Sequence, residues 1–167
     1  MKRKLEITAS NIQTCIAEIF DGILIHGSSS QLKNYHSFPE ENYTYRQTID
    51  CIRRTESYLL KALEFVEFLG TPSTMEYTAT AKSGTVKKDP YGTCSYQYRD
   101  ETGTISLVRH ITGRIDITRD KDGTTICITL ETMGKLSLES PQETRTYYPD
   151  QTILKETTGC RTPDLRQ

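Results

Sequence analysis

The chain has 167 residues, a net charge of −1 and five widely spaced cysteines. This length is typical of one domain, and we expect a single domain over 1–167, with a helical part at 8–70, antiparallel strands at 75–157 and a loose tail at 159–167. The 21 basic and 22 acidic side chains argue against binding to nucleic acid, which requires a strong positive field. The odd number of cysteines indicates free thiols in a reducing cytoplasm. No apolar run is long enough for a membrane span, so we expect no membrane association.

Two amphipathic helices are predicted in the first half of the chain. In the first helix, apolar side chains recur at helical spacing at Ile12, Ile16, Ile19 and Ile23. Ser10 or Asn11 can cap its start, and Gly27 favours its end. A second helix is expected from about Asn42 to Leu69, because Gly70 and then Pro72 are typical of the residues that follow a helix.

Glu56 interrupts the apolar stripe of the second helix. By its angle around the helix axis it points between Ile52 and Leu63. One hypothesis is a carboxylate in an apolar pocket that acts as an acid or base. The structural alternatives are a kink, a frayed edge of the apolar face, or an ion pair with Arg53.

From Met75 the apolar period changes from that of a helix to that of a strand. The alternation predicts six to seven antiparallel strands in a meander, with one apolar and one polar face. A sheet with one apolar face must bury it. The predicted fold is therefore α+β, with two N-terminal helices packed on one face of the sheet. Both a sheet that curves around the long helix and a partly closed barrel are consistent with this pattern.

The stretch 117–128 predicts the register of one hairpin. Asp122-Gly123 is a strong signal for a two-residue type I′ turn, which places Ile117 opposite Ile128. The same acidic residues resemble a calcium loop. However, Thr118 and Thr129 stand where that loop needs carboxylates, so we expect no metal.

Candidate functional residues are few, and we expect no cofactor. The ten tyrosines suggest a protein contact surface, with candidates at Lys87, Lys88, Tyr91, Arg145, Tyr147 and Tyr148. His110 is a pocket candidate together with Glu56. Cys94 is expected near His110 across two paired strands, which would allow a Cys–His dyad or simply bury a small apolar group.

The leading hypothesis is a non-catalytic cytoplasmic protein-interaction module, which is an inhibitor, adaptor or immunity-type partner of a larger protein. An alternative is a ligand-binding or enzymatic pocket between helix and sheet that uses Glu56. A weaker alternative is binding to nucleic acid through tyrosine and arginine on the sheet. An exposed edge strand would also allow the chain to pair with its own copy.

Overall fold

The computed structural model describes residues 2–28, 39–69, 77–81, 84–150 and 152–157. In these residues the chain forms two helices, α1 (Lys2–Ser28) and α2 (Pro39–Leu69), followed by nine strands. The strands are β1 (Tyr77–Ala81), β2 (Gly84–Lys88), β3 (Cys94–Asp100), β4 (Gly103–Arg109), β5 (Ile115–Lys121), β6 (Thr124–Leu130), β7 (Leu136–Glu139), β8 (Glu143–Tyr147) and β9 (Ile153–Thr157). The predicted tail at 159–167 lies outside the described residues.

The strands pair in chain order, and each strand is antiparallel to the next. This is the predicted α+β meander, with nine strands in the described chain rather than six to seven. The two extra strands come from short segments, β2 and β9, whose alternation is too brief to decide from sequence. Because β1 and β9 are the two edges, the sheet is open rather than a closed barrel.

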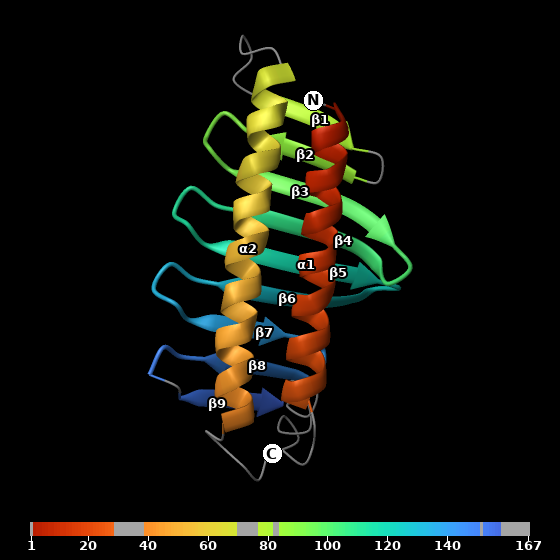
Figure 1. The fold of residues 1–167 in the computed structure, drawn as a ribbon. Helices are drawn as coiled ribbons and strands as arrows, with labels where there is room; N and C mark the ends of the chain where they lie inside the picture. Colours follow the sequence, from red (N-terminus) through yellow and green to blue (C-terminus); the bar gives the residue numbers. More distant parts are fainter. Residues whose placement is uncertain (1, 29–38, 70–76, 82–83, 151, 158–167) are drawn as a thin grey trace.

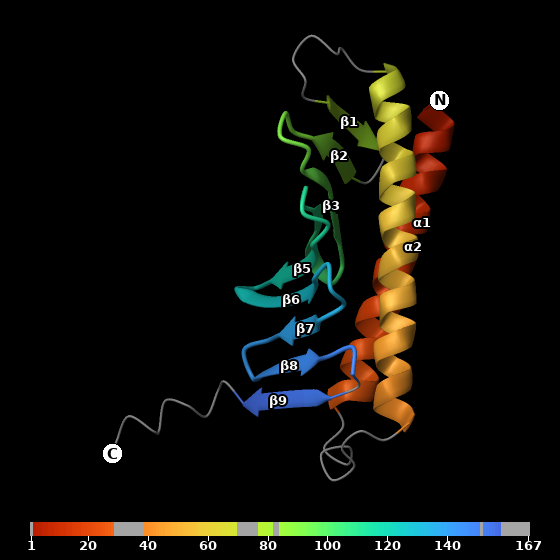
Figure 2. The ribbon, with the colours of Figure 1, turned by 90° about the vertical axis from the view of Figure 1, so that its left-hand side faces the viewer.

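The molecule has two layers (Figures 1 and 2). Both helices run across the strands and pack side by side on one face of the sheet. The opposite face is not covered by any part of the chain that the structure describes (Figure 2). This arrangement follows from the strand pattern, since alternate residues of β3 and β4 are buried and their neighbours are not.

The core fills the space between the helices and the sheet. Its members are apolar side chains from α1, α2 and the helix-facing side of β2 to β8, and they include Ile12, Ile52, Leu59, Tyr96, Leu107, Ile117 and Leu138. Burying one such side chain contributes about 1.5–3 kcal/mol before conformational entropy is subtracted. The core therefore holds both layers together along most of the sheet.

The first helix begins at Lys2, eight residues before the predicted cap at Ser10. The reason is that its apolar stripe continues toward the N-terminus. Leu5 and Ala9 are both 2% exposed and stand seven residues before Ile12 and Ile16. Packing against the sheet therefore outweighs the local capping signal.

The predicted register of the 117–128 hairpin is confirmed. Ile117 pairs with Ile128, and Lys121 pairs with Thr124 around the turn. Asp122 and Gly123 have φ angles of 52° and 80°, as a type I′ turn requires. Because every second residue points the same way, this one register sorts the whole of β5 and β6 into a helix-facing side and an open side.

Candidate functional site

Four turns line one side of the sheet, at the strand ends beside α2 (Figure 1). They span 89–93, 110–114, 131–135 and 148–152. In each turn the first residue's N–H donates to the carbonyl of the fifth, over 2.8–2.9 Å. They lie on one side because a meander returns to the same side of the sheet after every second strand. We call these four turns the turn ladder.

A glycine occupies the fourth position of the first three turns, at Gly92, Gly113 and Gly134. Each has a positive φ, between 95° and 100°. In each case a Cβ would approach a side chain of the next turn, at 3.2 Å for Ile111, 3.3 Å for Thr132 and 3.2 Å for Pro149. The three glycines are 21 residues apart, so the turn ladder is built from a repeated hairpin whose turns stack.

The turn ladder carries the most exposed large apolar side chains in the described chain. Met133 is 88% exposed, Tyr91 80% and Ile111 72%, whereas the next such residue, Ile7 on α1, is 55% exposed. Each of the three stands on a different turn. Three strongly exposed apolar side chains therefore lie on one side of the sheet.

Hydrogen bonds hold the turns in place. Tyr45 of α2 donates its hydroxyl to the carbonyl of Gly134 over 2.8 Å, and burial raises the pKa of that hydroxyl. Thr132 donates to the carbonyl of Thr112 over 2.8 Å, which links two successive turns. In the first turn, Asp89 accepts the N–H groups of Tyr91 and Thr93, both at 2.9 Å. These hydrogen bonds therefore fix the backbone of three of the turns.

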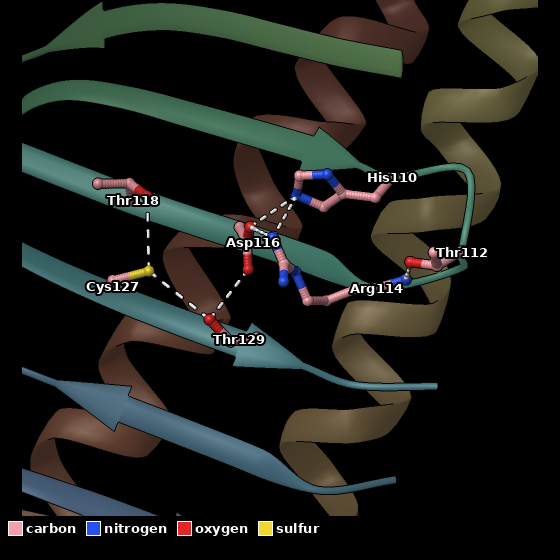
Figure 3. A network of polar contacts seen from close by, with 7 residues as sticks. All are labelled: His110, Thr112, Arg114, Asp116, Thr118, Cys127 and Thr129. Atoms are coloured by element: carbon pink, nitrogen blue, oxygen red, sulfur yellow. Dashed lines mark hydrogen bonds and ion pairs between the residues drawn. The ribbon is translucent and has the colours of Figure 1, made fainter. Parts of the chain in front are cut away.

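A polar network begins at the second turn and continues on the open face of the sheet (Figure 3). Asp116 is its centre, and its Oδ2 lies 2.7 Å from Nε2 of His110 and 3.4 Å from Nη2 of Arg114. Thr129 donates to the other oxygen over 2.9 Å. Cys127 lies 3.7 Å from the Thr129 hydroxyl. The network ties the second turn to β5 and β6.

This network does not assemble a catalytic dyad. A nucleophile must lie within hydrogen-bond reach of its base, yet Thr129 and Asp116 stand between the thiol of Cys127 and the ring of His110 (Figure 3). Cys94, the cysteine considered from sequence, is 4% exposed and donates to the carbonyl of Gly92 over 3.5 Å. The imidazole therefore has a structural partner, and neither thiol contacts it.

The structure places Glu56 and His110 on opposite faces of the sheet. Glu56 contacts Nε of Arg109 at 2.7 Å and Nη1 of Arg53 at 3.1 Å on the helix side, and its side chain is 15% exposed. His110 reaches Asp116 on the open side. Glu56 thus forms an ion pair with Arg53, which was one of the structural alternatives to a catalytic role. It forms a second ion pair with Arg109 of β4.

Two of the predicted contact residues lie in the core. Arg145 is 0% exposed and Tyr147 is 1% exposed. Nη1 of Arg145 donates to the carbonyl of Ile23 over 3.0 Å and to the Tyr147 hydroxyl over 2.8 Å, and Nε contacts Glu143 at 2.6 Å. Its buried Nη2 has no hydrogen-bond partner among the described residues. These side chains join β8 to α1 and are out of reach of a partner.

The remaining contact candidates do not form one patch. Lys87 and Lys88 are on β2, whereas Tyr148 follows β8, six strands away. Tyr148 is half-buried beneath Lys135, whose Nζ lies 6.0 Å from the ring centre. Tyr91 and Tyr148 belong to the first and last turns of the turn ladder. Tyr91 and Tyr148 were predicted contact residues and Ile111 and Met133 between them were not, although the 21-residue spacing of the glycines is visible in the sequence.

A hollow of about 370 Å³ lies between the helices, away from the turn ladder. Its lining includes Glu18, Asp21, Cys51 and Arg54. Arg54 donates to the Cys51 sulfur over 3.0 Å, but burial raises the pKa of the Cys51 thiol, so it stays protonated at neutral pH. The hollow thus holds a passive thiol rather than an activated nucleophile.

Comparison with protein-family models, with curated proteins and with solved structures finds no match. None of the helices in the described part of the chain is long and apolar enough to cross a membrane. Within the same residues, no group of three His, Cys, Asp or Glu side chains is arranged to hold a metal ion.

Proposed function

We propose that this protein is a non-catalytic protein-interaction module, of the inhibitor, adaptor or immunity type, and that the turn ladder is its contact surface. The observation that carries the proposal is the exposure of Tyr91, Ile111 and Met133, which stand on three successive turns and are each more than 70% exposed. Aromatic residues and methionine are enriched at the centres of protein interfaces. A partner that covers this row removes apolar area from water, which favours association.

The rigidity of the turn ladder supports the same proposal. Binding costs free energy when loops must be ordered, and a preformed surface avoids that cost. Here the stacked turns, the Thr132 bond to the carbonyl of Thr112 and the Tyr45 bond to the carbonyl of Gly134 restrain the surface. The pairing of Glu56 and His110 with other charged side chains also favours a contact role over a catalytic one.

We place the protein in the cytoplasm as part of this proposal. Cys15, Cys51 and Cys127 are free thiols in the structure, as a reducing compartment maintains them. The partner we expect is a protein rather than a nucleic acid, because the net charge of −1 provides little attraction for phosphate.

The test compares one turn-ladder variant with one matched control. Ile111→Glu places a charge on the second turn, and Ile7→Glu places the same charge on an exposed apolar position of α1. Each tagged protein is crosslinked in its native cell, and stoichiometric partners are identified by mass spectrometry. We expect the wild-type protein and Ile7→Glu to recover the same partner and Ile111→Glu to lose it. Equal recovery by all three proteins, or no partner at all, would contradict the proposal.

A further inference from the structure

A second hollow, of about 380 Å³, lies on the side of the sheet opposite the turn ladder. It is formed where the β3–β4 and β5–β6 hairpins turn, at 101–102 and 122–123, and these hairpin ends extend beyond α1 (Figure 1). Its volume is in the range of sites that hold small molecules, about 300–1,000 Å³. We call it the hairpin hollow, and its lining residues are Thr102, Arg119, Lys121, Asp122, Thr124 and Ile126.

Two cationic side chains stand on one face of the hairpin hollow. Arg119 and Lys121 are two residues apart on β5, so they point to the same side of the sheet as the buried Ile117. The register of the hairpin places Thr124 opposite Lys121 and Ile126 opposite Arg119. These four lining residues therefore lie side by side on the helix-facing side of one hairpin.

Arg119 is half-buried and lacks a carboxylate partner. In the part of the chain that the structure describes, three arginines are buried or half-buried. Nε of Arg109 lies 2.7 Å from Glu56, and Nε of Arg145 lies 2.6 Å from Glu143. Arg119, the third, forms no ion pair or hydrogen bond with the described residues. A charge withdrawn from water is normally paired, because burial without a partner costs free energy.

The neighbours of Arg119 hold its guanidinium without using its hydrogen-bond donors. The carbon Cζ lies 4.6 Å from the centre of the Phe20 ring. The cross-strand neighbours are Ile105, which is 1% exposed, and the half-buried Ile126. An aromatic ring attracts a cation through its face, and the guanidinium keeps its planar fork of N–H donors for an acceptor from outside the chain. Such a fork matches the oxygens of a phosphate or a carboxylate.

The charges and donors of the hairpin hollow favour a phosphate over a carboxylate. Arg119 and Lys121 carry two positive charges, and Asp122 is the acidic residue in the lining. A phosphate monoester carries about −1.5 to −2 at pH 7 and has three terminal oxygens. The guanidinium of Arg119, the ammonium of Lys121 and the hydroxyl of Thr124 provide three groups that can donate to them. Ile126 provides an apolar surface for the organic part of the same molecule.

We propose that the hairpin hollow binds a small phosphate monoester, whose phosphate oxygens accept hydrogen bonds from Arg119 and Lys121 and whose organic part lies on Ile126. A single phosphate group senses chiefly the charges within about one Debye length, roughly 8–10 Å. The net charge of −1 therefore does not oppose this binding as it opposes binding to a nucleic acid. The site lies away from the turn ladder and is independent of it.

The experiment measures binding of phenyl phosphate, inorganic phosphate and benzoate to the full-length protein. Isothermal titration calorimetry gives the affinities, and amide chemical shifts map the contact. Arg119→Gln removes the fork, and Lys121→Gln removes an exposed charge without a role in the core. Arg99→Gln is the matched control, because it changes the net charge equally at an exposed position on the open face of β3. Circular dichroism verifies that each variant is folded.

We expect phenyl phosphate to bind at least about tenfold more tightly than benzoate. It should also bind more tightly than inorganic phosphate, because its ring contacts Ile126. Arg119→Gln should weaken its binding by about tenfold or more, and Lys121→Gln by about threefold. Arg99→Gln should leave the affinity unchanged, and the chemical shifts should move in β5 and β6.

Several results would overturn the inference. They are a Kd for phenyl phosphate above about 10 mM, equal affinity for benzoate, equal losses in Arg119→Gln and Arg99→Gln, and chemical shifts confined to residues outside the hairpin hollow. If Arg119→Gln does not fold, an unchanged affinity in Lys121→Gln overturns it instead. The two proposals fail separately, because Ile111→Glu alters the turn ladder and should bind phenyl phosphate as the wild-type protein does.

Discussion

Gly103 and Gly123 provide a matched test of how closely the hairpins pack. Both glycines have positive φ, 126° and 80°, where an alanine is strained by about 1–2 kcal/mol. A Cβ at Gly123 would meet open space, whereas a Cβ at Gly103 would collide with the carbonyl oxygen of Asp120 and lie 2.9 Å from Cβ of Lys121. Because Gly103 has no side chain, the β3–β4 turn can lie against the end of β5. Gly123 has no such neighbour.

The expected free energies follow from this difference. Each glycine-to-alanine change also restricts the unfolded chain, which offsets about 0.4–1 kcal/mol of the strain. Gly123→Ala should therefore lower the free energy of unfolding by about 1 kcal/mol or less. Gly103→Ala must in addition move backbone atoms, and we expect a loss of about 3 kcal/mol.

Urea unfolding of both variants, followed by circular dichroism, measures the two losses. The slope of the transition should stay the same, because the area exposed on unfolding does not change. Subtracting one loss from the other removes the unfolded-state contribution that the variants share. Losses that agree within about 0.5 kcal/mol would show that the β3–β4 turn does not touch β5 as described.

Three further predictions concern polar groups of the core and the turn ladder. Glu143→Gln should lower the free energy of unfolding by roughly 2 kcal/mol, because it leaves the buried Arg145 guanidinium without its carboxylate. Arg145→Met should lower it by less, because it removes the buried charge itself. Urea unfolding measures both losses, and a larger loss for Arg145→Met would contradict this reasoning. Tyr45→Phe should cost about 1 kcal/mol by the same measurement, through loss of its bond to Gly134, and an unchanged transition would refute that bond. Burial raises the pKa of Tyr98 above its ordinary value of 10.0, so stability should be constant below about pH 10 and fall as pH rises from there toward the raised pKa. Tyr98→Phe should flatten this alkaline decline in stability curves measured against pH, and an unaltered decline would count against the buried hydroxyl.

Much of the fold was readable from local patterns. Asp122-Gly123 predicted one hairpin, and the alternation around it assigned Ile117 and Ile128 to the buried face, as the structure confirms. These features are readable because a turn and the two strands beside it depend on adjacent residues. The packing of two helices on one face followed from the same alternation, since the apolar face must be covered.

The function-related features were harder to predict because they depend on contacts that are distant in sequence. Arg145 pairs with Leu138 across β7 and β8, and only this register reveals that an arginine points into the core. The adjacent Tyr147 and Tyr148 leave the face of β8 ambiguous in sequence. The 21-residue spacing of the turn-ladder glycines can be read from the sequence, but the triplets before Gly92 and Gly113, DPY and HIT, are unlike, so the sequence does not show that the turns stack.

Seven residues of α-helix rise about 10.5 Å, which is close to the roughly 9.6 Å that two neighbouring strands span. This match in length gives the architecture a natural unit of growth. One unit is a 21-residue hairpin, as between Gly92 and Gly113, with one extra pair of turns in each helix. Inserting all three segments together would lengthen the molecule while keeping every existing contact in register. Inserting the hairpin alone would separate Phe20 from Arg119. It would also shift every later contact between the helices and the sheet. A longer version of this protein should therefore differ in helix length and strand number at once.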